Sequence, residues 1–127
     1  METSISCYCG SLTAFSECCE PLIKGLTKAK TAEQLMRSRY SAYCTVAVDY
    51  LMATTHPSTR KYYSATSIKE WAEHCTWQRL EIHNISPTTI TFSAYFLDEN
   101  RVPNIHREHS TFQLEQETWY FVDGEVA

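Results

Sequence analysis

The residues most able to do chemistry lie at the N-terminus, where four of the six cysteines fall within the first nineteen residues. They form a Cys-x-Cys pair followed, after eight intervening residues, by a Cys-Cys pair. Four thiolates satisfy the preference of Zn²⁺ for sulfur and leave no open coordination position. The pattern therefore predicts a structural zinc site rather than a catalytic one, with the ligands Cys7, Cys9, Cys18 and Cys19.

A glycine behind the first pair supports this interpretation. Gly10 can adopt the positive φ that turns a backbone N–H toward a thiolate.

The alternative is that the four cysteines form disulfides or remain scattered thiols. Adjacent cysteines suit a disulfide poorly, because the bridge needs a particular Cα separation and particular Cβ directions. The other two, Cys44 and Cys75, are expected to be buried, and a catalytic Cys75 beside His74 is disfavoured because adjacent helical residues do not face each other.

The cysteine segment resembles a known element. Residues 7–19, CYCGSLTAFSECC, resemble the SEC-C motif, a small zinc-binding element. The resemblance implies the four cysteine ligands and the turn at Gly10. Lysines common in that motif are replaced here by Thr13, Ala14, Ser16 and Glu17. We therefore expect no binding to anionic membranes, and we expect any protein partner of this module to contact its apolar side chains, Tyr8, Leu12 and Phe15.

The whole chain has the composition of a globular protein. Its 127 residues are 43% hydrophobic and 20% charged, which suits one main domain with an added zinc element. The net charge of −4 argues against nucleic-acid binding, because phosphate contacts need a basic surface. No basic leader or apolar run long enough to span a membrane is present in the sequence, so a cytoplasmic location is expected.

The pattern after residue 30 predicts helices first. Residues 20–30 are polar and turn-prone, which indicates a linker. A capping box at Thr31 and Gln34 begins a helix whose apolar stripe continues to about Thr54, with a break near the β-branched residues at 45–48. On the other side of that helix, a solvated face is expected at Arg37, Ser38, Arg39 and Ser41. Either arginine could instead pair with Glu108 or Asp123.

Strands follow the helices. A polar loop is expected at 57–66 and a helix, begun by a capping box at Ser67 and Glu70, at about 67–75. From residue 78 the hydrophobic period changes to two, which predicts strands at about 78–86, 90–97, 106–116 and 119–122. Turns are expected at 98–100 and 117–118, and the last strand is expected to end before Asp123 and Gly124. Helices followed by an antiparallel meander indicate an α+β fold in which the helices cover one face of a curved sheet.

The order of these motifs resembles one family. LMRSRYSAY (35–43), HPSTR (56–60), EHSTF (108–112) and WYFVDG (119–124) are similar to the YchJ-like family. Its members join a SEC-C motif to a nuclear-transport-factor-two-like domain. The resemblance implies a cone-shaped α+β domain and a metal, but no assigned reaction. It divides the chain into a SEC-C module with its linker at 1–25 and a cone domain at 26–127.

Such a cone encloses a space between its sheet and its helices. Aromatic residues with polar tips could line it together with polar groups at a helix end, and the candidates are Tyr43, His56, Arg60, Trp71, Tyr95 and Trp119. No catalytic residue is assigned, and plain packing is the alternative. His106 and His109 cannot chelate together, since their spacing sends them to opposite faces of a strand.

Two functions remain open. The first is a zinc-binding adaptor module that docks a protein partner. The second is a small-ligand-binding protein or enzyme that uses the cone cavity. Two or more titratable groups converging on a cavity would favour the second function, whereas a filled cone would favour the first.

Overall fold

The computed structural model describes residues 6–126 as a short cysteine-containing segment, a layer of helices and a four-stranded sheet. The helical elements are the 3₁₀ turn η1 (Phe15–Glu17), α1 (Glu20–Ile23), α2 (Ala32–Thr45), α3 (Val48–Ala53), α4 (Pro57–Arg60) and α5 (Ala65–His74). The strands are β1 (Thr76–Ile85), β2 (Thr89–Leu97), β3 (Pro103–Glu115) and β4 (Thr118–Val126). Within the described residues, no helix is long and apolar enough to cross a membrane.

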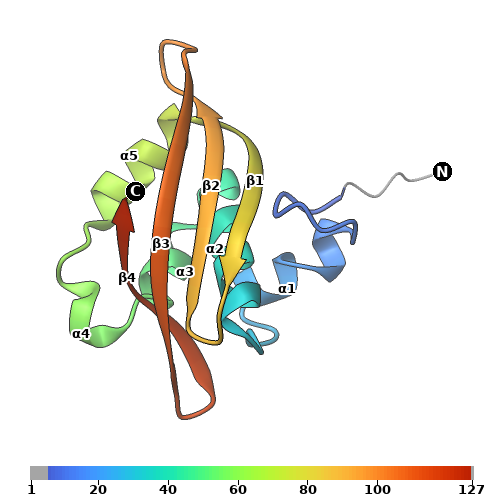
Figure 1. The fold of residues 1–127 in the computed structure, drawn as a ribbon, viewed down its shortest axis with the longest axis vertical. Helices are drawn as coiled ribbons and strands as arrows, with labels where there is room; N and C mark the ends of the chain where they lie inside the picture. Colours follow the sequence, from blue (N-terminus) through green and yellow to red (C-terminus); the bar gives the residue numbers. More distant parts are fainter. Residues whose placement is uncertain (1–5, 127) are drawn as a thin grey trace.

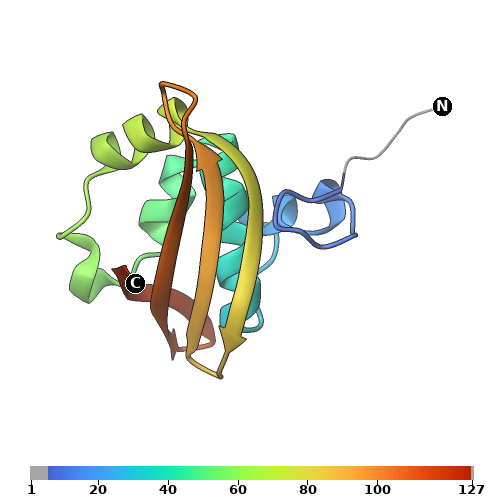
Figure 2. The same cartoon turned by 45° about the horizontal axis from the view of Figure 1, so that its top comes forward.

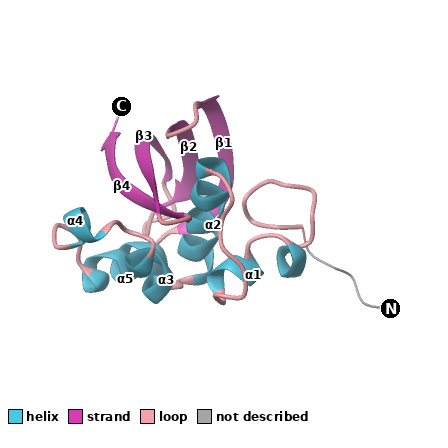
Figure 3. Cartoon of the chain, turned by 90° about the horizontal axis from the view of Figure 1, so that it is seen from below, coloured by secondary structure: helices cyan, strands magenta, loops and turns pink. Residues whose placement is uncertain are grey.

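The strands form an antiparallel meander in the order β1-β2-β3-β4 (Figure 1). The sheet is curved, and the helices gather on one of its faces (Figure 3). The β3–β4 turn consists of Gln116 and Glu117, with φ of 51° and 65°. Both values belong to a two-residue type I′ turn, so the predicted turn at 117–118 is one residue too late. The last strand also continues beyond its predicted end at Val122 and reaches Val126.

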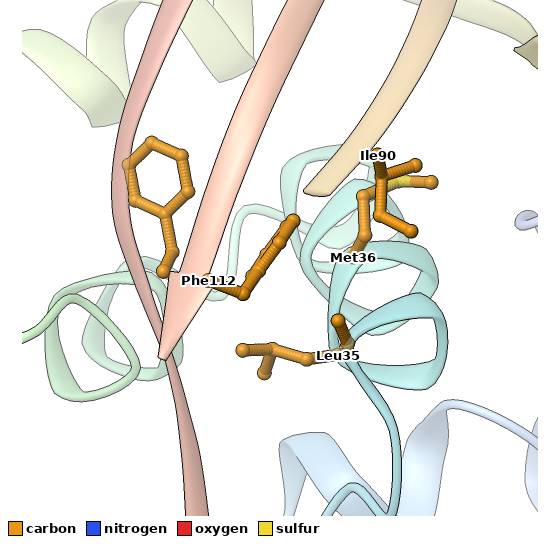
Figure 4. Packing of buried hydrophobic residues seen from close by; sticks show 6 residues of the cluster. Leu35, Met36, Ile90 and Phe112 are labelled. Atoms are coloured by element: carbon orange, nitrogen blue, oxygen red, sulfur yellow. The ribbon is translucent and has the colours of Figure 1, made fainter. Parts of the chain in front are cut away.

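Helix α2 supplies most of the contact between helices and sheet. Leu35 and Met36 of this helix point toward Ile90 of β2 and Phe112 of β3 (Figure 4). These side chains belong to one buried cluster that also includes Phe121 of β4. Because the strands alternate, the residues on the face of Ile90 and Phe112 all lie toward α2. The helix and one face of the sheet therefore form the walls of the cone.

The ends of α2 follow local rules. The Thr31 hydroxyl accepts the Gln34 N–H, as the capping box predicts, but the Gln34 side chain accepts the N–H of Lys30 rather than that of Thr31. The helix ends at Thr45, and Val46 then has a φ of 58°. A β-branched residue in this left-handed region cannot continue a helix. The predicted break before α3 is thereby confirmed.

Three segments differ from the sequence-based expectation. Residues 20–23 form α1 instead of a linker, and residues 57–60 form α4, since His56 caps a turn that begins with proline. Helix α5 begins three residues earlier than predicted. Its cap is Ser64, whose hydroxyl accepts the Ser67 N–H, so Ser67 lies inside the first turn.

The edge strand β4 is partly covered by the connection between α3 and α4. Phe121 donates its N–H to the carbonyl of Thr54, and His56 donates its N–H to the carbonyl of Phe121, at 2.8 and 2.7 Å. This short parallel bridge fixes the end of α3 against the sheet.

The cysteine segment lies on the opposite side, beside β1 and α2 (Figure 2). It is attached through α1, whose Leu22 is buried and whose Ile23 packs both on the cysteines and on the α2–α3–α5 cluster. The proposed division into parts 1–25 and 26–127 stays a prediction.

Candidate functional site

The four N-terminal cysteines converge on one point. All four sulfurs lie within 4.8 Å of one another, with Cys9 Sγ 3.7 Å from Cys18 Sγ and Cys18 Sγ 3.9 Å from Cys19 Sγ. A tetrahedral Zn²⁺ with Zn–S bonds of about 2.3 Å holds its sulfurs about 3.8 Å apart. A disulfide would hold them about 2.05 Å apart. The cysteines are free thiols at metal-ligand spacing, so the disulfide alternative does not apply to them.

The loop around the first pair directs donors at the sulfurs. Gly10 has a φ of 91°, as expected, and its N–H bonds the Cys7 carbonyl at 3.2 Å. The turn brings the Ser11 N–H to Cys9 Sγ, and the Ser11 hydroxyl lies 3.2 Å from Cys18 Sγ. Such donors stabilise thiolates that are bound to a metal.

Helix α2 completes the surroundings of the cluster. The Ser41 hydroxyl lies 3.5 Å from Cys7 Sγ, and Arg37 donates from Nη1 to the Cys9 carbonyl at 2.6 Å while its Nε pairs with Glu33 at 2.9 Å. Ser38, Arg39 and Ser41 are all buried. The expected solvated face is therefore wrong, because the cysteine segment covers one side of it. A positive charge at Arg37 also suits a Zn(Cys)₄ group, whose net charge is −2.

Proton affinities in the cluster show the effect of crowding four thiols. The hydrogen bond with Cys19 lowers the pKa of Cys9 to about 4, although burial acts in the opposite direction. The same hydrogen bond, together with burial, raises the pKa of Cys19, and burial raises that of Cys18. Without a cation, ionisation of Cys9 makes Cys18 and Cys19 harder to deprotonate. A bound metal ion would allow all four to ionise together.

A second site lies between α2 and the sheet. It is a cavity of about 80 Å³ with aromatic walls and a few polar groups. Its lining includes Arg39, Tyr40 and Tyr43 from α2, Trp71 from α5, and Trp77 from β1, and from β3 it includes His106, Glu108 and Ser110. The cone is therefore not filled, and three titratable groups of different kinds converge on its interior.

Arg39 is the cationic group of this cavity. Only 8% of its surface is exposed, and its guanidinium carbon lies 4.4 Å from the centre of the Phe121 ring. Nη1 donates to the Leu51 carbonyl at 2.9 Å and to the Thr54 hydroxyl at 2.7 Å, with the Thr55 hydroxyl at 3.5 Å. Neither arginine pairs with Glu108 or Asp123, because the Arg37 carboxylate partner is Glu33 and Arg39 has no ion pair within residues 6–126.

Glu108 is the anionic group. His106 Nε2 lies 2.8 Å from Glu108 Oε1, and the Ser110 hydroxyl donates to Oε2. Burial raises the pKa of Glu108, but these hydrogen bonds outweigh burial and the pKa lies below its ordinary value. A β-carbon on Gly124 would clash with the Glu108 carboxylate, so this glycine makes the room in which the carboxylate lies.

The structure brings together only part of the pocket set expected from sequence. Tyr43 and Trp71 line the cavity. Tyr95 points to the opposite face of β2, where its hydroxyl bonds Glu81 at 3.1 Å, because it is one residue out of phase with Ala94. The remaining three also lie elsewhere: Trp119 packs against the buried cluster around Leu35 and Phe112, His56 bonds Glu115, and Arg60 donates to the Thr55 carbonyl.

Sequence reasoning did not assign Arg39, His106 and Glu108 to the pocket, although the signal for placing them there was present. Strand alternation backward from the buried Phe112 places Ser110, Glu108 and His106 on the inner face. Arg39 is three residues after Met36 and four before Tyr43, so it lies on the apolar stripe. His109 lies on the outer face and bonds Thr91, which confirms that the two histidines diverge.

The two isolated cysteines do not form a site. Burial raises the pKa of Cys44 to about 12, and burial raises that of Cys75 as well. Raised values keep both sulfurs as thiols, which are poor nucleophiles.

Comparison with known proteins gives consistent matches along the chain. The family model described as "YchJ, middle NTF2-like domain" matches residues 31–124. A UPF0225 protein from Geobacter sulfurreducens is 38% identical over 125 residues, covering 93% of this chain and 77% of the relative. One from Haemophilus influenzae is 36% identical over 127 residues, covering 96% and 78%.

Two solved structures resemble the whole chain. A SEC-C motif containing protein from Rhodopseudomonas palustris superposes with a TM-score of 0.88 at 31% identity, covering 97% of this chain and 99% of the other. A sec-c motif containing protein from Psychrobacter arcticus superposes with a TM-score of 0.78 at 27% identity, covering 96% and 82%.

Proposed function

The chain belongs to the YchJ family, UPF0225, with its nuclear-transport-factor-two-like fold, and we propose that it is a zinc-stabilised small-ligand-binding protein. In this proposal Cys7, Cys9, Cys18 and Cys19 hold one structural Zn²⁺, and the cavity of the cone domain takes the ligand. The fold and the SEC-C resemblance expected from the sequence are confirmed by these comparisons.

Sulfur spacing supports the metal assignment. The separations of 3.7 and 3.9 Å agree with the tetrahedral value of about 3.8 Å for Zn²⁺, and no open position remains for a substrate. A bound zinc would join Cys7 and Cys9 to Cys18 and Cys19 and so cross-link the segment around η1. Arg37 and Ser41 would hold that segment against α2.

Elemental analysis tests the metal. We expect one zinc per chain after reconstitution, and an X-ray absorption spectrum with four sulfurs at about 2.3 Å. Cys18→Ser should lose the metal, whereas Cys75→Ser, a matched control far from the cluster, should keep it. Substoichiometric zinc in the native chain, or an unchanged zinc content in Cys18→Ser, would contradict the proposal.

The cavity carries the ligand-binding part of the proposal. The observation that favours it over simple packing is the convergence of Arg39, His106 and Glu108 on one interior space. The side chains of His106 and Glu108 keep 22% and 18% of their exposure, so solvent reaches this group. Groups of this kind with differing charge in an aromatic pocket are typical of ligand sites.

Protein docking through the cysteine module is the second candidate function. Leu12 is 95% exposed and Tyr8 41% exposed, whereas Phe15 is half-buried and packs on Tyr8 and on the cysteines. The contact surface would therefore centre on Leu12. Leu12→Ser should abolish capture of a partner while zinc stays bound, and retained capture would place the partner surface elsewhere.

The same module should not bind anionic membranes. Its loop carries no lysine between residues 7 and 19, and four thiolates on Zn²⁺ add negative charge. Co-sedimentation with acidic vesicles at physiological salt should therefore be negligible. Salt-sensitive binding that chelation removes would refute this expectation.

A further inference from the structure

The cavity is lined by the guanidinium of Arg39, which forms no ion pair with a carboxylate of residues 6–126. Arg39 uses Nη1 for the acceptors at the end of α3, and no hydrogen bond from Nε or Nη2 to any atom of residues 6–126 is found. These two nitrogens form one edge of the guanidinium, and such an edge matches the two oxygens of a carboxylate. We propose that the cavity binds a small monocarboxylate, held by this edge of Arg39. The inference rests on the proposed ligand-binding function and names its ligand class.

Glu108 is held in place by partners other than Arg39. His106 and Ser110 occupy its two oxygens, and Gly124 lets the carboxylate lie close to the backbone of β4. Its charge and that of Arg39 still attract each other, but they form no ion pair. A buried charge without a close counter-ion is costly, so a ligand that supplies one gains affinity.

Glu108 also limits the charge of the ligand. With Arg39 and an ionised Glu108, the cavity carries one positive and one negative group. A monoanion that reaches Arg39 is attracted overall, whereas a second carboxylate would approach Glu108 and be repelled. The arrangement therefore favours monocarboxylates over dicarboxylates.

The volume and the walls define the rest of the ligand. A cavity of about 80 Å³ leaves room for a small molecule only. Short-chain acids such as propionate and butyrate belong to this class. The surrounding rings of Tyr40, Tyr43, Trp71 and Trp77 offer an apolar surface to the alkyl part of such an acid.

Titration of the zinc-loaded full chain with butyrate tests the proposal. Butyramide has the same shape without the charge, and succinate has a second carboxylate. We expect butyrate to shift the Nε–H resonance of Arg39 in an NMR spectrum and to change the fluorescence of Trp71 and Trp77. Butyramide should bind at least about tenfold more weakly, the loss expected when one charge-assisted hydrogen bond is removed. Succinate should also bind more weakly than butyrate, because its second carboxylate is repelled by Glu108.

Substitutions separate the roles of the two charged groups. Arg39→Gln should weaken butyrate about tenfold or more and abolish the preference over butyramide. Arg79→Gln, a matched control at an exposed position over the Tyr95 ring, should bind butyrate as the native chain does. Glu108→Gln should bind butyrate more tightly and admit succinate. If Arg39→Gln fails to fold, the Nε–H shift in the native chain still decides the matter.

The outcomes distinguish the two levels of the proposal. Equal binding of butyrate and butyramide would overturn the carboxylate assignment while leaving the cavity a ligand site. Absence of binding by the acids and by the amide would overturn both the assignment and the proposed ligand-binding function. Butyrate binding without a shift of the Arg39 Nε–H would also overturn the assignment.

Discussion

Gly10→Ala is a direct test of the metal site proposed for the cysteine loop. Gly10 has a φ of 91°, and a β-carbon there would lie 3.9 Å from Arg37 Nη1 and 3.9 Å from the Leu80 carbonyl oxygen. Both distances are ordinary van der Waals contacts. The cost of alanine is therefore conformational, about 1–2 kcal/mol for an L-residue in the left-handed region.

That cost should appear in metal affinity. In the proposed zinc-bound state the loop would keep the Gly10 conformation, whereas the metal-free loop could relax, so the strain would fall on the bound state. At 1.4 kcal/mol per tenfold change, zinc affinity should fall about five- to thirtyfold. Competition against a chromophoric chelator at neutral pH measures this loss directly.

Gly25→Ala is the matched control. Gly25 also has a positive φ, 77°, and a β-carbon there would meet no atom within 4 Å. The substitution strains the end of α1, outside the cysteine loop, so the free energy of unfolding of the protein should fall. Zinc affinity should change less than about twofold. Unchanged affinity in Gly10→Ala, or equal losses in the two variants, would refute the reasoning.

Three further outcomes are expected. A chain that begins at Thr31 should unfold cooperatively, since its central buried cluster contains no cysteine; calorimetry without such a transition would make the cysteine segment part of the core. Gln116→Asn combined with Glu117→Gly should stabilise the protein by about 1 kcal/mol, because both positions have positive φ, and an unchanged urea midpoint would contradict this. The folded pKa of Glu108 lies below its ordinary 4.5, so its stabilising contribution is complete above that pH and is lost as the pH falls through the folded pKa. Glu108→Gln should therefore weaken the acid-side loss of stability in urea titrations, and an unaltered pH profile would contradict it.

Local signals predicted most of the fold. The capping box at Thr31, the β-branched break near Val46 and the alternation of β2 each depend on residues close in sequence. The cysteine ligand set could be proposed for the same reason, because all four residues lie on one short loop. The β3–β4 turn was placed one residue late, since neither Gln116 nor Glu117 is a residue that favours positive φ.

Contacts between residues far apart in the sequence were harder to predict. The polar face of α2 was expected to meet water because charge and hydroxyl groups usually do. In the structure Arg37 and Ser41 meet the cysteine segment, and Arg39 lies in the cavity. Cys7 is 34 residues from Ser41 in sequence, and the Phe121 ring beside Arg39 is further still along the chain, so no local pattern encodes these contacts.

The position of the Gly10 turn has a consequence for how the chain behaves among its own copies. A four-stranded open sheet has two free edges, each able to pair with a strand from another molecule. The β4 edge is paired in part with the segment around Thr55. At the other edge, the Gly10 turn lies against the Leu80 carbonyl of β1. If loss of the proposed metal releases this turn, the β1 edge becomes available for strand addition. The proposed zinc site would then protect the protein from self-association as well as ordering its own loop.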